Sequence, residues 1–193
     1  MFKFIFYFLY IVLYPIYRFH FIGRENIPAG PCVMCGNHTA NIDSVLLVFA
    51  NGSKGDFGFI AKEELFRFKP FGAFLRSVGA IPVKRSTMDM HAVKAGFSIL
   101  KSGKKLLLFP EGTRVKVGMR SEPKPGAALF SVRGKAPMLP VYIPAGRKAF
   151  HRNDIIIGKP YTPAVEGKPD ARQYQEITED LMQRIMSLPS EVK

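Results

Sequence analysis

The chain has little of several features that would assign it to common protein classes. It has no low-complexity tract or internal repeat, only two cysteines in 193 residues, and 15 Asp and Glu against 28 Lys and Arg. A hydrophobic content of 47% excludes a disordered chain. The shortage of acid leaves a formal charge of +13. This charge implies an anionic partner: nucleic acid, a phospholipid surface or a phosphorylated metabolite.

The two cysteines, Cys32 and Cys35, have the C-x-x-C spacing of redox and zinc motifs. They lie in an apolar run that reads as a buried strand, where an offset of three places side chains on opposite faces. A zinc site also needs a second pair of ligands, and none is suitably spaced. We therefore predict two reduced core thiols, as in a cytosolic catalytic domain.

The N-terminus has no charged residue between Phe4 and Tyr17. As a helix this stretch is roughly 21 Å long, shorter than a hydrocarbon core of about 30 Å. Its many Phe and Tyr residues are typical of the membrane interface. We expect residues 1–22 to form a membrane-anchoring helix that dips into one leaflet, or spans only by recruiting residues as far as Ile22. The alternative is an ordinary buried helix.

Residues 23–193 show strands alternating with helices, which predicts one α/β domain with a mostly parallel or mixed sheet flanked by helices. Expected strands lie at 31–36, 57–61, 80–83, 104–109, 140–143 and 154–157. Expected helices begin near Asn41, cover the region of residues 71–78, and span 88–101 and 174–188. No linker indicates a second globular domain.

His38 follows the first of these strands, and Asp43 stands five positions later. On one continuous helix this spacing would keep the two side chains apart, but a turn before the helix allows contact. A neutral imidazole oriented by a carboxylate can act as a general base. The alternative is a turn histidine beside a helix-capping acid.

Two further polar segments follow apolar strands, where α/β folds usually place their sites. Lys84 and Arg85 would clamp a phosphate, or form a solvated basic turn. The segment Phe109-Pro110-Glu111-Gly112-Thr113-Arg114 places Glu111 and Arg114 around a glycine that permits close approach of a ligand to the backbone. Its alternative is a structural turn with an exposed Glu-Arg pair.

Four motifs together resemble the glycerolipid acyltransferases, and most closely the bacterial 1-acyl-sn-glycerol-3-phosphate (lysophosphatidic acid) acyltransferases. In order they are Asn37-His38-x-x-x-x-Asp43, Gly79-x-Ile81-x-x-x-Arg85, Phe109 to Arg114, and Pro140-Val141-x-Ile143. The resemblance covers roughly residues 23–160. Ala40 is a departure, since many members carry serine there, and Val115 is another.

The resemblance implies acyl transfer from acyl-CoA or acyl carrier protein to the free hydroxyl of a lysophospholipid, giving phosphatidic acid in phospholipid biosynthesis. His38 would be the base and Asp43 its orienting partner, with no covalent acyl-enzyme. Arg114, supported by Lys84 and Arg85, would hold the acceptor phosphate. Glu111 would position glycerol hydroxyls or a neighbouring cation, and N–H groups near Gly112 would stabilise the oxyanion. Gly112 and Thr113 are also expected among the substrate-binding residues.

No cofactor or metal is expected, because His20, His91 and His151 lack ligand spacing. The expected partners are an anionic lysophospholipid, an acyl thioester and a membrane surface, with no nucleic acid. The expected location is the cell membrane, with the catalytic domain on the cytoplasmic side. The alternatives are a related enzyme acting on glycerol 3-phosphate or another lysolipid, and a basic membrane-surface binding protein without catalysis.

Overall fold

A seven-stranded sheet forms the centre of the protein, in the order β1-β7-β6-β2-β5-β3-β4. The computed structural model describes residues 2–83, 90–116, 118–119, 121–165 and 167–192. The strands are β1 (Phe19–Ile22), β2 (Val33–Gly36), β3 (Phe57–Lys62), β4 (Ala80–Val83), β5 (Lys105–Leu108), β6 (Met138–Tyr142) and β7 (Asn153–Ile157). All neighbouring strands are parallel except β6 and β7. The predicted mixed α/β sheet is confirmed.

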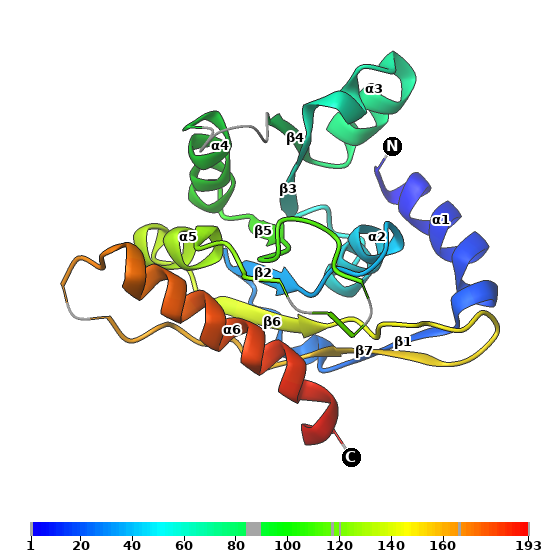
Figure 1. Ribbon diagram of the computed structural model, residues 1–193. Helices are drawn as coiled ribbons and strands as arrows, with labels where there is room; N and C mark the ends of the chain where they lie inside the picture. The colour runs from blue at the N-terminus through cyan, green and yellow to red at the C-terminus, as the bar shows by residue number, and fades with distance from the viewer. Residues whose placement is uncertain (1, 84–89, 117, 120, 166, 193) are drawn as a thin grey trace.

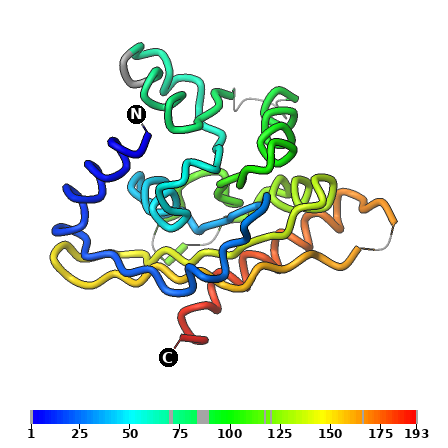
Figure 2. Tube along the Cα trace, turned by 180° about the vertical axis from the view of Figure 1, so that it is seen from behind, coloured from blue at the N-terminus to red at the C-terminus, as the bar shows by residue number. Residues whose placement is uncertain are grey.

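Helices cover both faces of this sheet (Figures 1 and 2). They are α1 (Phe2–Tyr17), α2 (Ile42–Asn51), α3 (Lys69–Ser77), α4 (Met90–Lys101), α5 (Gly126–Gly134) and α6 (Ala171–Glu191), with short 3₁₀ turns at Arg24–Asn26 and Glu63–Phe66. Helices α1 and α2 pack into one core cluster, whereas α4, α5 and α6 pack into a second cluster on the other face.

Strand β2 shows how the apolar runs of the sequence fill both cores. Met34 packs into the cluster with α1 and α2, and Val33 and Cys35 pack into the cluster with α5 and α6. Cys32, just before the strand, lies on the Met34 side. Both thiols are free and fully buried. Burial raises the pKa of Cys32 to about 12 and that of Cys35 well above its ordinary value, so neither is a thiolate at neutral pH.

The apolar N-terminal segment divides into a helix and a strand. Helix α1 ends at Tyr17, and Phe19–Ile22 form β1, which pairs in parallel with β7. Recruitment of residues up to Ile22 into a longer helix is therefore wrong, because that stretch belongs to the sheet. Within the described part of the chain, no helix combines the length and the apolar character needed to cross a membrane.

The other expected elements are present with small shifts at their ends, and the helix that the sequence did not reveal is α5. Its sequence, GAALFSVRG, has glycine at both ends and little apolar periodicity, so it lacks the stripe that marks a helix. Helix α6 begins at a capping box, in which Asp170 and Gln173 bond each other's backbone N–H groups at 2.8 and 2.9 Å.

The fold brings two of the sequence motifs to one edge of the sheet. Strands β2 and β5 are hydrogen-bonded neighbours and run in parallel. Their carboxyl ends therefore lie side by side, and the chain leaves them as the turn containing His38 and the loop containing Glu111. This is the edge at which open α/β sheets bind their ligands.

Candidate active site

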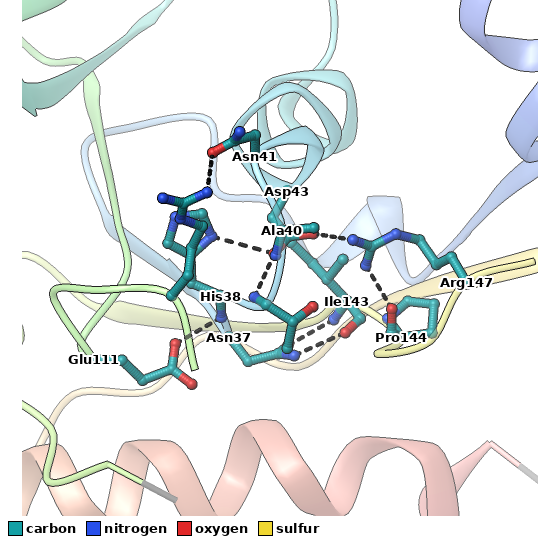
Figure 3. Close-up of polar contacts among 11 residues, drawn as sticks. Asn37, His38, Ala40, Asn41, Asp43, Glu111, Ile143, Pro144 and Arg147 are labelled. Atoms are coloured by element: carbon teal, nitrogen blue, oxygen red, sulfur yellow. Dashed lines mark hydrogen bonds and ion pairs between the residues drawn. The ribbon is translucent and has the colours of Figure 1, made fainter. Parts of the chain in front are cut away.

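His38, in the turn after β2, meets Asp43 in the first turn of α2 (Figure 3). His38 Nδ1 lies 3.2 Å from Asp43 Oδ2; the histidine side chain is 15% exposed and the aspartate side chain is fully buried. The tautomer protonated on Nδ1 donates to the carboxylate and leaves Nε2 with a free lone pair. The predicted pair is thus in contact, and its geometry is that of an oriented general base.

Asp43 is held by more than His38. Its Oδ2 also accepts the backbone N–H groups of Thr39 and Ala40 at 2.6 and 2.7 Å. Burial alone would raise the pKa of Asp43, but the hydrogen bonds from His38 and Ala40 and the charge of Arg147 outweigh it. The pKa therefore lies below its ordinary value, and the carboxylate stays ionised. Because Ala40 contributes its main chain, the missing serine hydroxyl does not enter this network.

Arg147 is a residue of the site that the sequence did not reveal. It lies in the connection between β6 and β7, its side chain is 5% exposed, and its Nη2 donates to Asp43 Oδ1 on the side away from His38 (Figure 3). Its Nη1 donates to the carbonyl of Pro144. The dyad predicted from the motif is therefore a triad of His38, Asp43 and Arg147.

Asn37 fixes the start of this turn against β6. Its side-chain N–H donates to the carbonyl of Ile143 at 2.8 Å, and its Oδ1 accepts the Ile143 N–H at 2.8 Å. The residue is only 3% exposed. Both amide groups are thus used to join the ends of β2 and β6, which explains an asparagine immediately before His38.

The loop after β5 encloses His38. The ring of Phe109 stacks on the imidazole with 4.1 Å between centroids and 14° between planes. The Val115 N–H donates to the His38 carbonyl at 2.8 Å, and Glu111 Oε2 accepts the His38 N–H at 2.6 Å. Glu111 was expected to position glycerol hydroxyls or a cation. Instead its buried carboxyl group holds the main chain of the histidine.

The remaining predicted site residues lie at the rim or outside the described residues. Arg114 is exposed and donates from Nη1 to Asn41 Oδ1 at 2.9 Å, which places its charge over the start of α2. Thr113 is exposed. Gly112 has φ +67, and its N–H donates to the Phe109 carbonyl at 3.0 Å. Lys84 and Arg85, the predicted phosphate clamp, lie outside the described residues.

Lys124 is a second cation at this rim that the sequence did not reveal. A β-carbon added at Gly112 would lie 3.0 Å from both Cδ and Cε of Lys124. The Lys124 N–H also donates to the Pro110 carbonyl at 2.7 Å. The Lys124 side chain thus lies across Gly112, and the positive φ of this residue favours glycine there.

Residues 18–144 match the sequence model of the Acyltransferase family. A protein of Bacillus subtilis named 1-acyl-sn-glycerol-3-phosphate acyltransferase is 30% identical over 178 residues, which cover 88% of this chain and 87% of that protein. The chain belongs to the Acyltransferase family. The family inferred from the four motifs is confirmed.

Two further comparisons agree with this membership. A Pseudomonas aeruginosa protein of the same name is 32% identical over 133 residues, 67% of this chain and about half (51%) of that protein's length. The crystal structure of the 1-acyl-sn-glycerophosphate (LPA) acyltransferase PlsC from Thermotoga maritima superposes with a TM-score of 0.67 at 21% identity. It covers 97% of this chain and 94% of that one. At this identity the likeness shows the acyltransferase fold.

The described residues of this acyltransferase include no group of three or more His, Cys, Asp or Glu side chains placed to hold a metal ion. The titratable groups at the site are instead bound to one another or to the backbone, as His38, Asp43 and Glu111 show.

Glu111 makes the stability of the acyltransferase fold depend on pH. Burial raises its pKa to about 7 from an ordinary value of 4.5, outweighing the hydrogen bond from His38. The folded state then holds a proton that the unfolded chain releases, so this contribution to stability is complete below about pH 4.5 and is lost as pH rises through about 7. In Glu111→Gln, which keeps an acceptor oxygen but does not titrate, we expect this decline to be missing.

Urea unfolding of both proteins at a series of pH values measures the difference. Glu179→Gln, on the exposed side of α6, serves as the control and should keep the wild-type decline. Parallel pH profiles for wild type and Glu111→Gln would show that Glu111 is ionised throughout this range in the folded protein.

Proposed function

We propose that this protein is a 1-acyl-sn-glycerol-3-phosphate acyltransferase. It transfers a fatty acyl group from acyl-CoA or acyl carrier protein to the free hydroxyl of lysophosphatidic acid and forms phosphatidic acid. The observation that carries the proposal is the contact of His38 Nδ1 with the buried Asp43, because it directs Nε2 toward an incoming hydroxyl. Membership of the family and the names of the relatives support the substrate class.

In the proposed reaction His38 Nε2 takes the proton of the acceptor hydroxyl as the oxygen attacks the thioester carbonyl. The imidazolium that forms is stabilised by the ionised Asp43. The tetrahedral oxyanion collapses, the C–S bond breaks, and the leaving thiolate takes the proton back from His38. The acceptor oxygen is itself the nucleophile, so no acyl-enzyme forms. Stacking on Phe109 keeps the ring in place during both proton transfers.

The oxyanion requires donors at the mouth of the site. The Gly112 N–H donates to the Phe109 carbonyl and is already engaged within the loop. We assign the role instead to the N–H groups of Thr113 and Arg114, which follow the positive-φ turn at Gly112. A turn of this kind directs successive N–H groups toward a common point, as in other anion-binding loops.

Arg114 and Lys124 are the cations that we assign to the acceptor phosphate. Both lie on the loop that encloses His38 and are exposed at its rim. A guanidinium group can bind a phosphate through two parallel hydrogen bonds, and a lysine adds a mobile positive charge. Lys84 and Arg85 remain predicted members of the same group.

For Arg114→Ala we expect a rise of roughly tenfold in KM for lysophosphatidic acid with kcat little changed, the effect of losing one exposed charge-assisted contact. Arg172→Ala, which removes an exposed cation from α6, is the matched control and should leave KM unchanged. The phosphate role would be rejected if Arg114→Ala left KM unaltered, or if kcat fell by as much as KM was expected to rise.

We further propose that the protein associates with the cytoplasmic side of the cell membrane through α1. Phe4, Phe8 and Ile11 on its outer side are 77, 57 and 69% exposed. The inner side packs by Phe6 on Phe49 of α2. Helix α1 would lie along the interface with its outer side in the lipid.

The function is tested by assaying the purified full chain with lysophosphatidic acid, lysophosphatidylcholine and glycerol 3-phosphate, each with acyl-CoA and with acyl carrier protein. We expect acylation of lysophosphatidic acid by far the fastest. Preference for glycerol 3-phosphate or lysophosphatidylcholine would move the protein to another acceptor class. No transfer under any condition would reject the enzyme and favour a membrane-surface binding protein.

A further inference from the structure

The connection between β6 and β7 holds an exposed aromatic residue in a strained conformation. Phe150 has φ 63, in the left-handed region that bulky side chains rarely adopt, and it is 68% exposed. Strain of this kind persists only where the surroundings impose it. The ring is largely exposed, so it is available to a partner outside the folded chain.

The surroundings that impose the strain belong to the end of α1. The Phe150 N–H donates to the Ile16 carbonyl, and the Phe150 carbonyl accepts Arg18 Nη1 at 3.4 Å. In addition, Asn153 donates from its side chain to the carbonyls of Tyr17, Lys148 and His151. The connection is thus fixed to the last turn of α1 from both sides.

The outer side of α1 continues from this point along the whole helix. Its exposed large apolar and aromatic residues are Phe4, Tyr7, Phe8, Ile11, Val12, Tyr14 and Ile16, with exposures from 77% down to 36%. The helix has a single charged residue, Lys3 near its N-terminus, which is also exposed. Phe150 lies next to the end of this row, because its N–H donates to the carbonyl of Ile16 in the last turn of the helix. Isolated exposed apolar residues are common, but a continuous row marks a contact surface.

The charges around Phe150 indicate which partner this surface meets. The connection reads Pro-Ala-Gly-Arg-Lys-Ala-Phe-His-Arg and contains no acid, and Arg18 adds a cation from the end of α1. The neighbouring Asp154 is engaged by Arg152 at 2.6 Å. An aromatic tip among cations complements the headgroup and acyl boundary of an anionic bilayer, where each nearby Lys or Arg adds attraction.

The same connection also reaches the catalytic residues. Arg147, three positions before Phe150, is buried against Asp43. A lipid contact made by Phe150 therefore lies on the same connection as Arg147, which holds the aspartate of the site.

We propose that Phe150 and the outer side of α1 form one lipid-binding surface, and that the β6–β7 connection inserts its phenylalanine into an anionic bilayer beside the site. The purpose of this lipid contact rests on the proposed function. The contact brings the site to an acceptor that resides in the membrane.

A single-tryptophan protein tests the insertion directly, because the chain contains no tryptophan. In Phe150→Trp we expect the emission to shift to shorter wavelength on addition of phosphatidylglycerol-containing vesicles, and to be quenched by lipids brominated on the acyl chain. Met186→Trp is the matched control, since Met186 is 57% exposed on α6, a helix of the opposite core cluster. Its emission should not change.

An unshifted Phe150→Trp spectrum with anionic vesicles would overturn the proposal. A shift that appears without lipid and grows with protein concentration would also overturn it, and would identify a second copy of the chain as the partner. These readouts need no acyl transfer, so they stand even where the proposed function fails.

Phe150→Asn and Phe150→Gly separate lipid binding from folding. Both residues accept a positive φ, so we expect Tm to stay constant or rise, whereas removal of the ring weakens vesicle binding about tenfold. Turnover of vesicle-embedded lysophosphatidic acid should fall, and turnover of a short-chain acceptor dissolved as monomer should not. Unchanged vesicle affinity in both variants would contradict the lipid contact, whereas absence of turnover in the wild type would contradict only the function.

Discussion

His38→Ala is expected to lower kcat for acyl transfer by a factor of about 10²–10⁴, the usual contribution of a positioned general base. The methyl group cannot take the hydroxyl proton, and no other imidazole contacts Asp43 among the described residues. The fold should persist, because the buried network of Asp43 with Thr39, Ala40 and Arg147 does not require the ring. Steady-state kinetics together with a thermal melt measures both effects.

His20→Ala is the matched control for this variant. His20 also lies near a carboxylate, 3.4 Å from Asp154, but the pair is exposed, at 54 and 40%, on the edge strand β1. We expect its activity to equal that of the wild type. Asp43→Asn should approach the loss seen in His38→Ala, because an amide neither fixes the tautomer nor stabilises the imidazolium. Near-normal turnover in His38→Ala would remove the histidine from the mechanism.

Arg147→Met is expected to lower both stability and activity. Breaking a buried ion pair leaves an uncompensated buried carboxylate, which costs about 3–5 kcal/mol in the free energy of unfolding. Removing the cation also raises the pKa of Asp43. Since the low pKa of this carboxyl stabilises the fold above its ordinary range and that gain is lost as pH falls, the variant should lose stability and activity at higher pH than the wild type.

Two comparisons distinguish this positioning role from loss of packing alone. Arg152→Met removes an exposed arginine of the same connection, one that pairs with Asp154. It should lower the free energy of unfolding by less than about 1 kcal/mol. Arg147→Lys keeps the positive charge but lacks the guanidinium group that donates to both Asp43 and the Pro144 carbonyl. It should recover part of the activity. Denaturant unfolding and a pH profile of kcat/KM give both measurements. If kcat/KM declines at the same acidic pH in Arg147→Met as in the wild type, Arg147 does not lower the pKa of Asp43.

The contact between His38 and Asp43 could be predicted from the sequence because the two residues are close in the chain. His38 and Asp43 are five positions apart, and the apolar run before them and the helix signals place His38 in the turn before the helix and Asp43 in the first turn of the helix. Arg147 contacts Asp43 across 104 positions of sequence. It stands between the expected strands at 140–143 and 154–157, in a segment where no motif indicated a role. The signal that could have found it is the buried charge of Asp43, which requires a cation beyond the imidazole.

The secondary structure, too, could be predicted where its signal is local and was missed where it depends on distant residues. Strands such as β2 and β5 are buried on both faces and appear as apolar runs, which the sequence shows directly. Strand β1 was hidden because its Phe-His-Phe-Ile follows the apolar helix after a single arginine, so the whole stretch reads as one segment. What ends the helix is tertiary: Arg18 adopts φ 40, and the chain turns to pair with β7. Such pairing depends on partners more than a hundred residues away.

The placement of the two thiols has a practical consequence. Cys32 reports on the layer that contains α1, and Cys35 reports on the layer beneath α6. Alkylation of each thiol under native conditions therefore follows the opening of its own side of the sheet. A detergent or bilayer that loosens α1 would expose Cys32 first. The relative alkylation rates of the two thiols therefore show which of the two hydrophobic layers has opened.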